Sequence, residues 1–210
     1  EIAEFDIEVD GDADAFNVAF ADEDDVGYEA NISVNADGAD EVTLLVNTYA
    51  AGHPNTDVRN AELTFTVETD DDDAEPRITR HDESGDITGI LDTGSYDVEV
   101  GVASIDDIRG DDAADDIGSL ELDARSTDAF NFWVTHDDTV EDIEDVDDVN
   151  DAIENELVVQ RDNIAIGDQA VFQLQASGLE GSLAVAGELG DTDELNEQLQ
   201  ILLDDTNSGV

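Results

Sequence analysis

The sequence predicts a mainly all-β protein: an immunoglobulin-like antiparallel β-sandwich, then a linker helix, then a second β-rich domain. Apolar residues alternate with polar ones over the first two thirds of the chain, and short turn sequences such as "NADGAD" and "DESGD" separate these segments. Apolar residues recur every three or four positions only after residue 139. We therefore expect domains at 1–138 and 156–210, with the helix at 139–155.

Eight segments of the first domain alternate in this way, with acidic residues at many of the intervening positions. One apolar face and one hydrated face are typical of a strand in an antiparallel sandwich. In chain order, the expected strands are 4–9, 15–20, 28–34, 41–49, 62–67, 96–102, 118–124 and 128–134.

The segment "LDTGSYDVEV" strengthens the immunoglobulin-like assignment. In such sandwiches a tyrosine lies two residues before a core position, and its hydroxyl bonds to backbone a few residues upstream. Tyr96 and Val98 fit these two positions, and Gly94 fits the preceding turn. The alternative interpretation is an ordinary hairpin entry.

The linker helix is predicted from Val140, Ile143, Val146, Val149 and Ile153, with Thr139 as its N-cap. The segment from Leu157 to Gly187 is again expected to be β-rich. A last helix is expected in "TDELNEQLQILLDD", with Leu195 and Leu199 on its apolar face and Thr192 as the cap. Because a further strand would be expected after "NSGV", we expect the second domain to be incomplete and the chain to be a fragment.

Charge is the most unusual property of the sequence. The chain has 59 Asp and Glu against six Arg and no Lys, which gives a formal net charge of -53. These acids are interleaved with Val, Ile, Leu and Phe, unlike a disordered acidic tail. Such a surface repels itself in dilute buffer but is tolerated in molar salt, where the Debye length is about 3 Å. We expect a halophilic protein that binds neither nucleic acid nor anionic lipid.

The cysteine count and the lengths of the apolar runs limit the kinds of site and the membrane topology that this sequence allows. The chain has no cysteine, so disulfides and thiolate metal sites are excluded. It has no apolar run of 18 residues and no secretory leader pattern, so we expect no direct membrane insertion by this chain.

The segment "NELVVQRDNIAIGDQAVFQLQASGLEGSL" (155–183) resembles one that recurs in haloarchaeal cell-surface and S-layer-type glycoproteins. The preceding "ILDTGSYDVEVGV" and "STDAFNFWVTHDD" are similar to the end of the unit before it in those proteins. The resemblance covers roughly residues 87–183. It implies an extracellular array of tandem β-sandwiches in the cell envelope, often glycosylated, and it implies no catalytic residues. A Thr/Ser-rich stalk and a C-terminal anchor, both found in that family, are not in this sequence.

Two kinds of candidate site carry chemistry. Asp10, Asp12 and Asp14 alternate as calcium ligands do and are a weak candidate for a structural Ca²⁺, although Ala15 and Ala21 replace the glycine and glutamate of an EF-hand loop. "TVETDDDDAEP" (66–76) is expected to be an acidic solvent loop, because consecutive carboxylates point in different directions. The sequon "NIS" makes Asn31 a candidate glycosylation site, the alternative being a chance tripeptide.

Other residue types are expected to be structural. His53, His81 and His136 lack ligand spacing and are expected at the surface. Trp133 is expected in packing rather than as a sugar platform, and "RGD" at 109–111 is expected to be a turn.

Three candidate functions are compared for this sequence. The first is a non-enzymatic structural pair of envelope domains, whose partners are neighbouring copies, other envelope proteins or a glycan. The second is an adhesin or carbohydrate-binding module of an exported protein. The third, an extracellular hydrolase, has no supporting motif.

Overall fold

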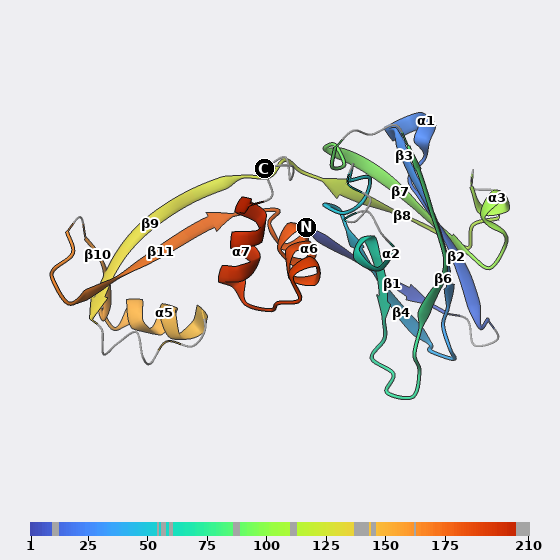
Figure 1. The fold of residues 1–210 in the computed structure, drawn as a ribbon. Helices are drawn as coiled ribbons and strands as arrows, with labels where there is room; N and C mark the ends of the chain where they lie inside the picture. Colours follow the sequence, from blue (N-terminus) through green and yellow to red (C-terminus); the bar gives the residue numbers. More distant parts are fainter. Residues whose placement is uncertain are drawn as a thin grey trace. The chain divides into compact units, whose positions relative to one another are not determined.

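In the computed structural model, two antiparallel sheets form a β-sandwich within the first of two compact units (Figure 1). This unit comprises Glu1–Ala124 with Gly178–Val210, and the second comprises Arg125–Ser177. The structure describes residues 1–9, 13–53, 55, 58, 61–85, 89–109, 113–136, 143, 146–161 and 163–204.

The sandwich has a five-stranded sheet in the order β6-β3-β2-β7-β8 and a three-stranded sheet in the order β1-β4-β5. The larger sheet contains β2 (Ala15–Phe20), β3 (Tyr28–Asn35), β6 (Arg77–Gly85), β7 (Gly94–Gly101) and β8 (Asp116–Leu122). The smaller sheet contains β1 (Ile2–Glu8), β4 (Glu41–Asn47) and β5 (Phe65–Glu68). The described parts of the connections contain three one-turn helices: α1 (Glu23–Val26), α2 (Ala61–Thr64) and α3 (Ile105–Ile108). The predicted all-β, antiparallel sandwich class is confirmed.

The sandwich core is built around Phe20, which is fully buried. Its ring packs edge-on against Phe65 with the centroids 5.9 Å apart, and it stacks on Tyr96 at 6.1 Å. Because Phe20 belongs to the five-stranded sheet and Phe65 to the three-stranded one, this pair joins the two layers. Alternating positions of β3 and β4 fill the remaining space, as their period-2 patterns predict.

The predicted bond from the Tyr96 hydroxyl to backbone a few residues upstream, known as a tyrosine corner, is present. Tyr96 is 3% exposed, and its hydroxyl donates to the carbonyl oxygen of Asp92 at 2.7 Å. This bond fixes the turn that leads into β7. Burial raises the pKa of the Tyr96 phenol above 10.0, and the nearby Asp92 carboxylate adds to the effect.

β6 is a strand that sequence patterning misses. It carries Arg80, His81, Asp82 and Glu83 in succession, and "DESGD" reads as a turn. β6 lies at the edge of the five-stranded sheet, where charged residues are common. Its pattern therefore reflects its edge position rather than a loop.

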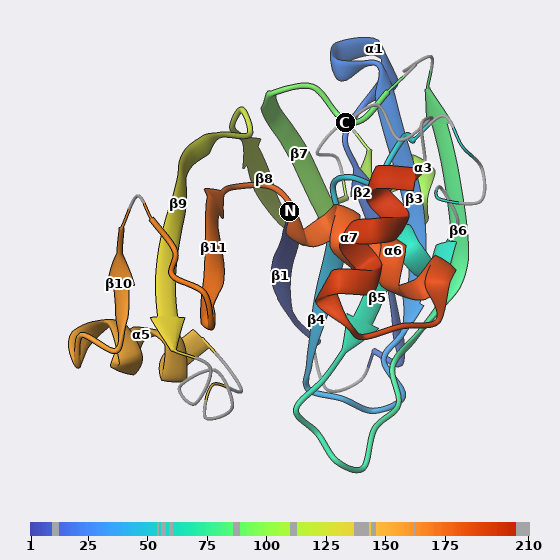
Figure 2. The same cartoon turned by 60° about the vertical axis from the view of Figure 1, so that its left-hand side comes forward.

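Two helices after residue 178 complete the first unit. α6 (Glu180–Gly190) and α7 (Leu195–Asp204) pack side by side (Figure 2). The predicted last helix is confirmed in α7. The expected β-structure at 180–187 is wrong, because "SLAVA" alternates like a strand but its small residues suit a helix equally well. Asn47 donates from Nδ2 to the carbonyl oxygen of Gly181 at 3.0 Å, and Val185 packs with Tyr49 and Ala50.

The second unit contains a three-stranded antiparallel sheet in the order β10-β9-β11, and its described residues include one helix. Its elements are β9 (Thr127–His136), α5 (Val146–Glu154), β10 (Val158–Gln160) and β11 (Asp168–Ala176). The predicted helix is confirmed over Val146–Glu154, but it lies inside this unit. The expected boundary at residue 138 differs from the boundary after Ala124, because β9 pairs with β10 and β11 rather than with the first sandwich.

Candidate functional site: the sequon and its arginine clamp

Asn31, the sequon asparagine, lies in the middle of β3 on the outer face of the five-stranded sheet. Its register partners are Ala19 on β2 and Asp82 on β6. The neighbouring residues Ala30 and Ile32 are fully buried, whereas Asn31 is half-buried. The alternation of β3 therefore turns the Asn31 amide away from the core and toward solvent.

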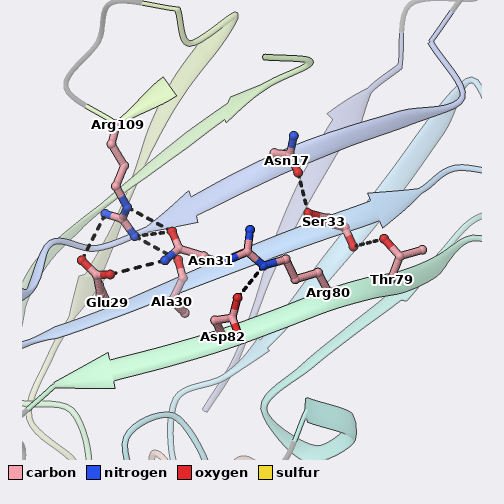
Figure 3. A network of polar contacts seen from close by, with 9 residues as sticks. All are labelled: Asn17, Glu29, Ala30, Asn31, Ser33, Thr79, Arg80, Asp82 and Arg109. Carbon is pink, nitrogen blue, oxygen red and sulfur yellow. Dashed lines mark hydrogen bonds and ion pairs between the residues drawn. The ribbon is translucent and has the colours of Figure 1, made fainter. Parts of the chain in front are cut away.

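Arg109 holds this amide from the end of α3 (Figure 3). It donates to Asn31 Oδ1 from Nε at 3.0 Å and from Nη2 at 2.8 Å. It also donates to the carbonyl oxygens of Ala21 at 2.6 Å and Ala30 at 3.2 Å, and it lies 3.8 Å from Glu29 Oε2. We call this set of bonds the Arg109 clamp.

The clamp decides which way the Asn31 amide faces. A guanidinium has only donors, so the atom that it contacts twice must be the amide oxygen. Nδ2, the atom that carries the sugar in an N-glycosylated asparagine, then points away from Arg109. It donates to Glu29 Oε1 at 3.3 Å, and a second N–H stays available for substitution.

Ser33, the hydroxyl residue of the sequon, is held as well. Its Oγ donates to Asn17 Oδ1 at 2.6 Å, and Asn17 Nδ2 donates to the carbonyl oxygen of Ala103 at 2.8 Å. Both sequon side chains are thus tied to the segment that contains α3, Asn31 through Arg109 and Ser33 through Asn17 and Ala103. Figure 3 shows the bonds of Asn31 to Arg109 and of Ser33 to Asn17.

A polar cavity of about 160 Å³ opens beside the clamp. Its walls carry the guanidinium of Arg109 and four carboxylates, those of Asp22, Asp25, Asp97 and Glu99. Ala19 and Ala21 complete the lining. Carboxylates accept hydrogen bonds from hydroxyls and water, and the guanidinium donates them. The arrangement suits hydroxylated or hydrated groups rather than apolar ones.

The calcium prediction concerned Asp10, Asp12 and Asp14. Asp10 and Asp12 lie outside the described residues, whereas Asp14 precedes β2 and its carbonyl oxygen accepts from the Ala36 amide at 2.9 Å. Across the described ranges, no group of three or more carboxylates or imidazoles gathers with metal-ligand geometry. The acidic loop at 69–76 follows β5, and Asp70, Asp71, Asp72 and Asp73 are exposed there.

Two of the three histidines contradict the expectation of a surface position. His53 is 4% exposed and lies against the Tyr49 ring at 5.2 Å. The His81 ring packs edge-on against Phe65 at 5.1 Å, and its Nε2 lies 3.0 Å from Glu83 Oε1. Only tertiary packing produces this burial, because turn-like sequence surrounds both residues. His136 is exposed, as predicted.

Trp133 is half-buried in β9, and its indole N–H donates to Gln173 Oε1 at 3.3 Å. The structure thus gives Trp133 a packing and hydrogen-bonding role within its own sheet.

Arg109 is the functional residue that sequence reasoning misses. Its hydrogen-bond partners lie 78 to 88 positions away in the chain. The spacing of residues within one segment therefore cannot predict them. Its place in "RGD" suggested a turn. The absence of lysine and the rarity of arginine are a weak signal that each cation has a specific task.

Comparisons with known proteins relate the chain to one group. Residues 1–103 match a family described as a domain of unknown function (DUF7827). The whole chain is 35% identical to a segment of a cell surface glycoprotein of Haloferax gibbonsii. It is 29% identical over 98% of its length to cell surface glycoprotein 1 of Haloarcula hispanica, and 31% identical over 71% to cell surface glycoprotein 2 of that organism.

The chain spans about a fifth of the length of these curated relatives, at 22%, 22% and 15%. No solved structure matches it. Among the helices that the structure describes, none is long and apolar enough to cross a membrane.

Proposed function

Because the chain is similar to cell surface glycoproteins of haloarchaea, we propose that it is a non-enzymatic, salt-adapted structural segment of the cell envelope. Its similarity to such a glycoprotein over its full length carries this proposal. The sandwich supports it, since the aromatic core is fixed by Tyr96 and Phe20 while the acidic loop faces solvent. The cell surface is outside the membrane, where brine meets this acidic exterior directly.

We propose further that Asn31 carries a glycan in the mature protein. The Arg109 clamp supports this, because it holds Oδ1 and leaves Nδ2 directed away from the guanidinium. An N-linked sugar leaves Oδ1 unchanged as an acceptor, so the clamp and the modification are compatible.

Cell fractionation and mass spectrometry test the two parts separately. The protein is expressed at full length in a haloarchaeal host, and its peptides that contain Asn31 are weighed. We expect a glycan mass on Asn31 in the wild type and in Ser33→Thr, which keeps the sequon, but not in Ser33→Ala. Both variants leave Asn31 and Arg109 in place.

An unmodified Asn31 in the wild type contradicts the glycan. Recovery of the protein inside the cell, rather than in the envelope fraction, contradicts the envelope role. The two outcomes are independent of each other.

A further inference from the structure

The sequon lies on a strand that is paired along both of its edges. β3 is second in the order β6-β3-β2-β7-β8. Each residue from Asn31 to Ser33 has one register partner on β2 and another on β6. Because the N–H and C=O groups of a central strand bond to its two neighbours, the sequon backbone has no free edge. Another protein therefore reaches that backbone only by separating β3 from one of its neighbours.

The side chains of the sequon are committed as well. On the outer face, Arg109 holds Asn31 Oδ1, and Ser33 Oγ donates to a side chain of β2 at 2.6 Å (Figure 3). The carbonyl oxygen of Ser33 accepts from Thr79 Oγ1 at 3.1 Å. Ile32, the residue between the two, is fully buried in the sandwich core. The fold thus presents one face of the tripeptide and occupies the other.

A transferase that recognises Asn-x-Ser needs more of the sequon than this fold exposes. The motif requires a hydroxyl residue at its third position, so such an enzyme must contact Ser33 Oγ as well as Asn31 Nδ2. The single hydroxyl proton of Ser33 is already donated to Asn17. Enclosing three consecutive residues also requires the side of the strand that carries Ile32. Separating a central strand from its sheet costs nearly the full stability of a cooperative domain, because the core opens with it.

The attached glycan meets none of these obstacles. Asn31 lies on the outer face, Arg109 bonds to Oδ1 of its amide, and Nδ2 keeps an N–H for substitution. A sugar on Nδ2 leaves Ile32 in the core and every strand pair intact. The folded sheet therefore accommodates the product of glycosyl transfer but withholds the substrate, and this difference dictates an order of events.

We propose that Asn31 is glycosylated on the unfolded chain, before β3 pairs with β2 and β6, and that folding then closes the sequon to the transferase. In this step Nδ2 loses one proton to a base of the transferase and forms a C–N bond to the anomeric carbon of a glycosyl phosphate donor. The phosphate leaves with the electron pair of the broken C–O bond. This order rests on the proposed glycan at Asn31 and adds its timing.

Induction of the transferase before or after folding tests this order. The full chain is expressed in a haloarchaeal host whose N-glycosylating transferase is under inducible control. In one arm the transferase is present while the chain is synthesised. In the other arm it is induced only after synthesis has stopped and the chains have folded in molar salt. Peptide mass spectrometry measures the fraction of Asn31 that carries a glycan in each arm.

An engineered sequon in the acidic loop after β5 is the matched control within the same chain. Asp71→Asn with Asp73→Thr completes the motif there, at exposed positions outside the strands. The amide oxygen that replaces Asp71 Oδ1 keeps the acceptor for the backbone N–H of residue 73. We expect both positions to be modified when the transferase is present during synthesis. When it is induced after folding, we expect modification at position 71 and at least about a 10-fold loss at Asn31.

A weakened core should reopen the sequon. Phe20→Ala removes the ring that joins the two layers and leaves the three sequon residues unchanged. Loss of a buried phenylalanine makes opening of the sheet much more frequent, so we expect at least about a 10-fold faster modification of Asn31 after folding. Ile117→Ala is the matched control, because Ile117 is a strand residue of the same sheet that is 51% exposed, and we expect no change.

Circular dichroism shows that each variant is folded before the transferase is induced. Equal modification of Asn31 and position 71 after folding overturns the proposed order. A loop sequon that also stays unmodified after folding overturns the role of the sheet, since the transferase then ignores folded chains altogether. Failure of the proposed glycan appears in the other arm, as an unmodified Asn31 when the transferase is present throughout synthesis.

Discussion

Tyr96 ties a local sequence motif to the stability of the whole sandwich. Its hydroxyl bonds to the Asp92 carbonyl oxygen at 2.7 Å, and its ring stacks on Phe20. Tyr96→Phe keeps the ring and removes the bond. We expect it to lower the free energy of unfolding by about 0.5–1.5 kcal/mol, the usual net value of one hydrogen bond. Urea unfolding in molar salt at neutral pH measures this loss.

The same variant has a pH signature. Burial, and then the Asp92 charge, raise the folded pKa of Tyr96 above 10.0. The unfolded chain therefore releases the phenol proton first, so stability is complete below pH 10 and is lost as pH rises through the folded pKa. Tyr96→Phe removes this alkaline decline. Asp92→Asn keeps the backbone acceptor and lowers the folded pKa of Tyr96 toward 10.0, so we expect a smaller decline that ends at lower pH. An unchanged alkaline slope in Tyr96→Phe contradicts the assignment.

At the residue scale, the sequence predicts the contacts of residues whose bonding partners are near in the chain. Tyr96 was predicted because its acceptor is four positions upstream. The burial of His81 against Phe65 and the reach of Arg109 to Asn31 depend on contacts between strands distant in sequence. No spacing within one segment encodes such contacts.

At the scale of elements, Gly181 sets how closely α6 approaches β4. A Cβ at this position would overlap Asn47 Oδ1, which cannot move freely because it accepts from the amides of Tyr49 at 3.1 Å and Ala50 at 3.3 Å. In an unconstrained helix, alanine would stabilise by about 1 kcal/mol over glycine. Here we expect Gly181→Ala to destabilise by about 1–3 kcal/mol, the usual cost of overpacking.

Urea unfolding, with hydrogen exchange of α6 and α7, measures this effect. Gly118→Ala on β8 is the matched control, because its Cβ meets nothing within 4 Å. Equal stability of Gly181→Ala and wild type would show that α6 does not depend on this contact.

The errors at this scale share one cause, since period-2 patterning identifies a strand only where one face is buried and the other hydrated. That condition holds for β3 and β4, which were predicted. It fails for β6, a charged edge strand, and for the Ala/Gly-rich α6, whose alternation is accidental. It also cannot tell which sheet a strand joins, so β9 was assigned to the first domain although it pairs with β11.

At the scale of the whole molecule, we expect net charge to govern stability. A formal charge of -53 on 210 residues is screened over about 10 Å at 0.1 M salt but over about 3 Å at 1 M. We therefore expect β-structure, followed by far-ultraviolet circular dichroism, to be lost as salt falls well below molar and to return when salt is restored. Unchanged stability in dilute buffer contradicts a halophilic adaptation.

The acidic loop after β5 separates screening from specific cation binding. Asp70, Asp71, Asp72 and Asp73 are exposed, and Asp71 Oδ1 accepts from the Asp73 amide at 3.0 Å.

Replacing all four of these aspartates by Asn removes four charges and keeps that acceptor. If the loop contributes only repulsion, the variant needs less salt to fold and is as stable as wild type in molar salt. If the loop holds a structural cation, the variant is less stable in molar salt, because an ion that binds only the folded state stabilises it. Since all four are exposed and belong to no group of possible metal ligands among the described residues, we expect the salt midpoint to fall.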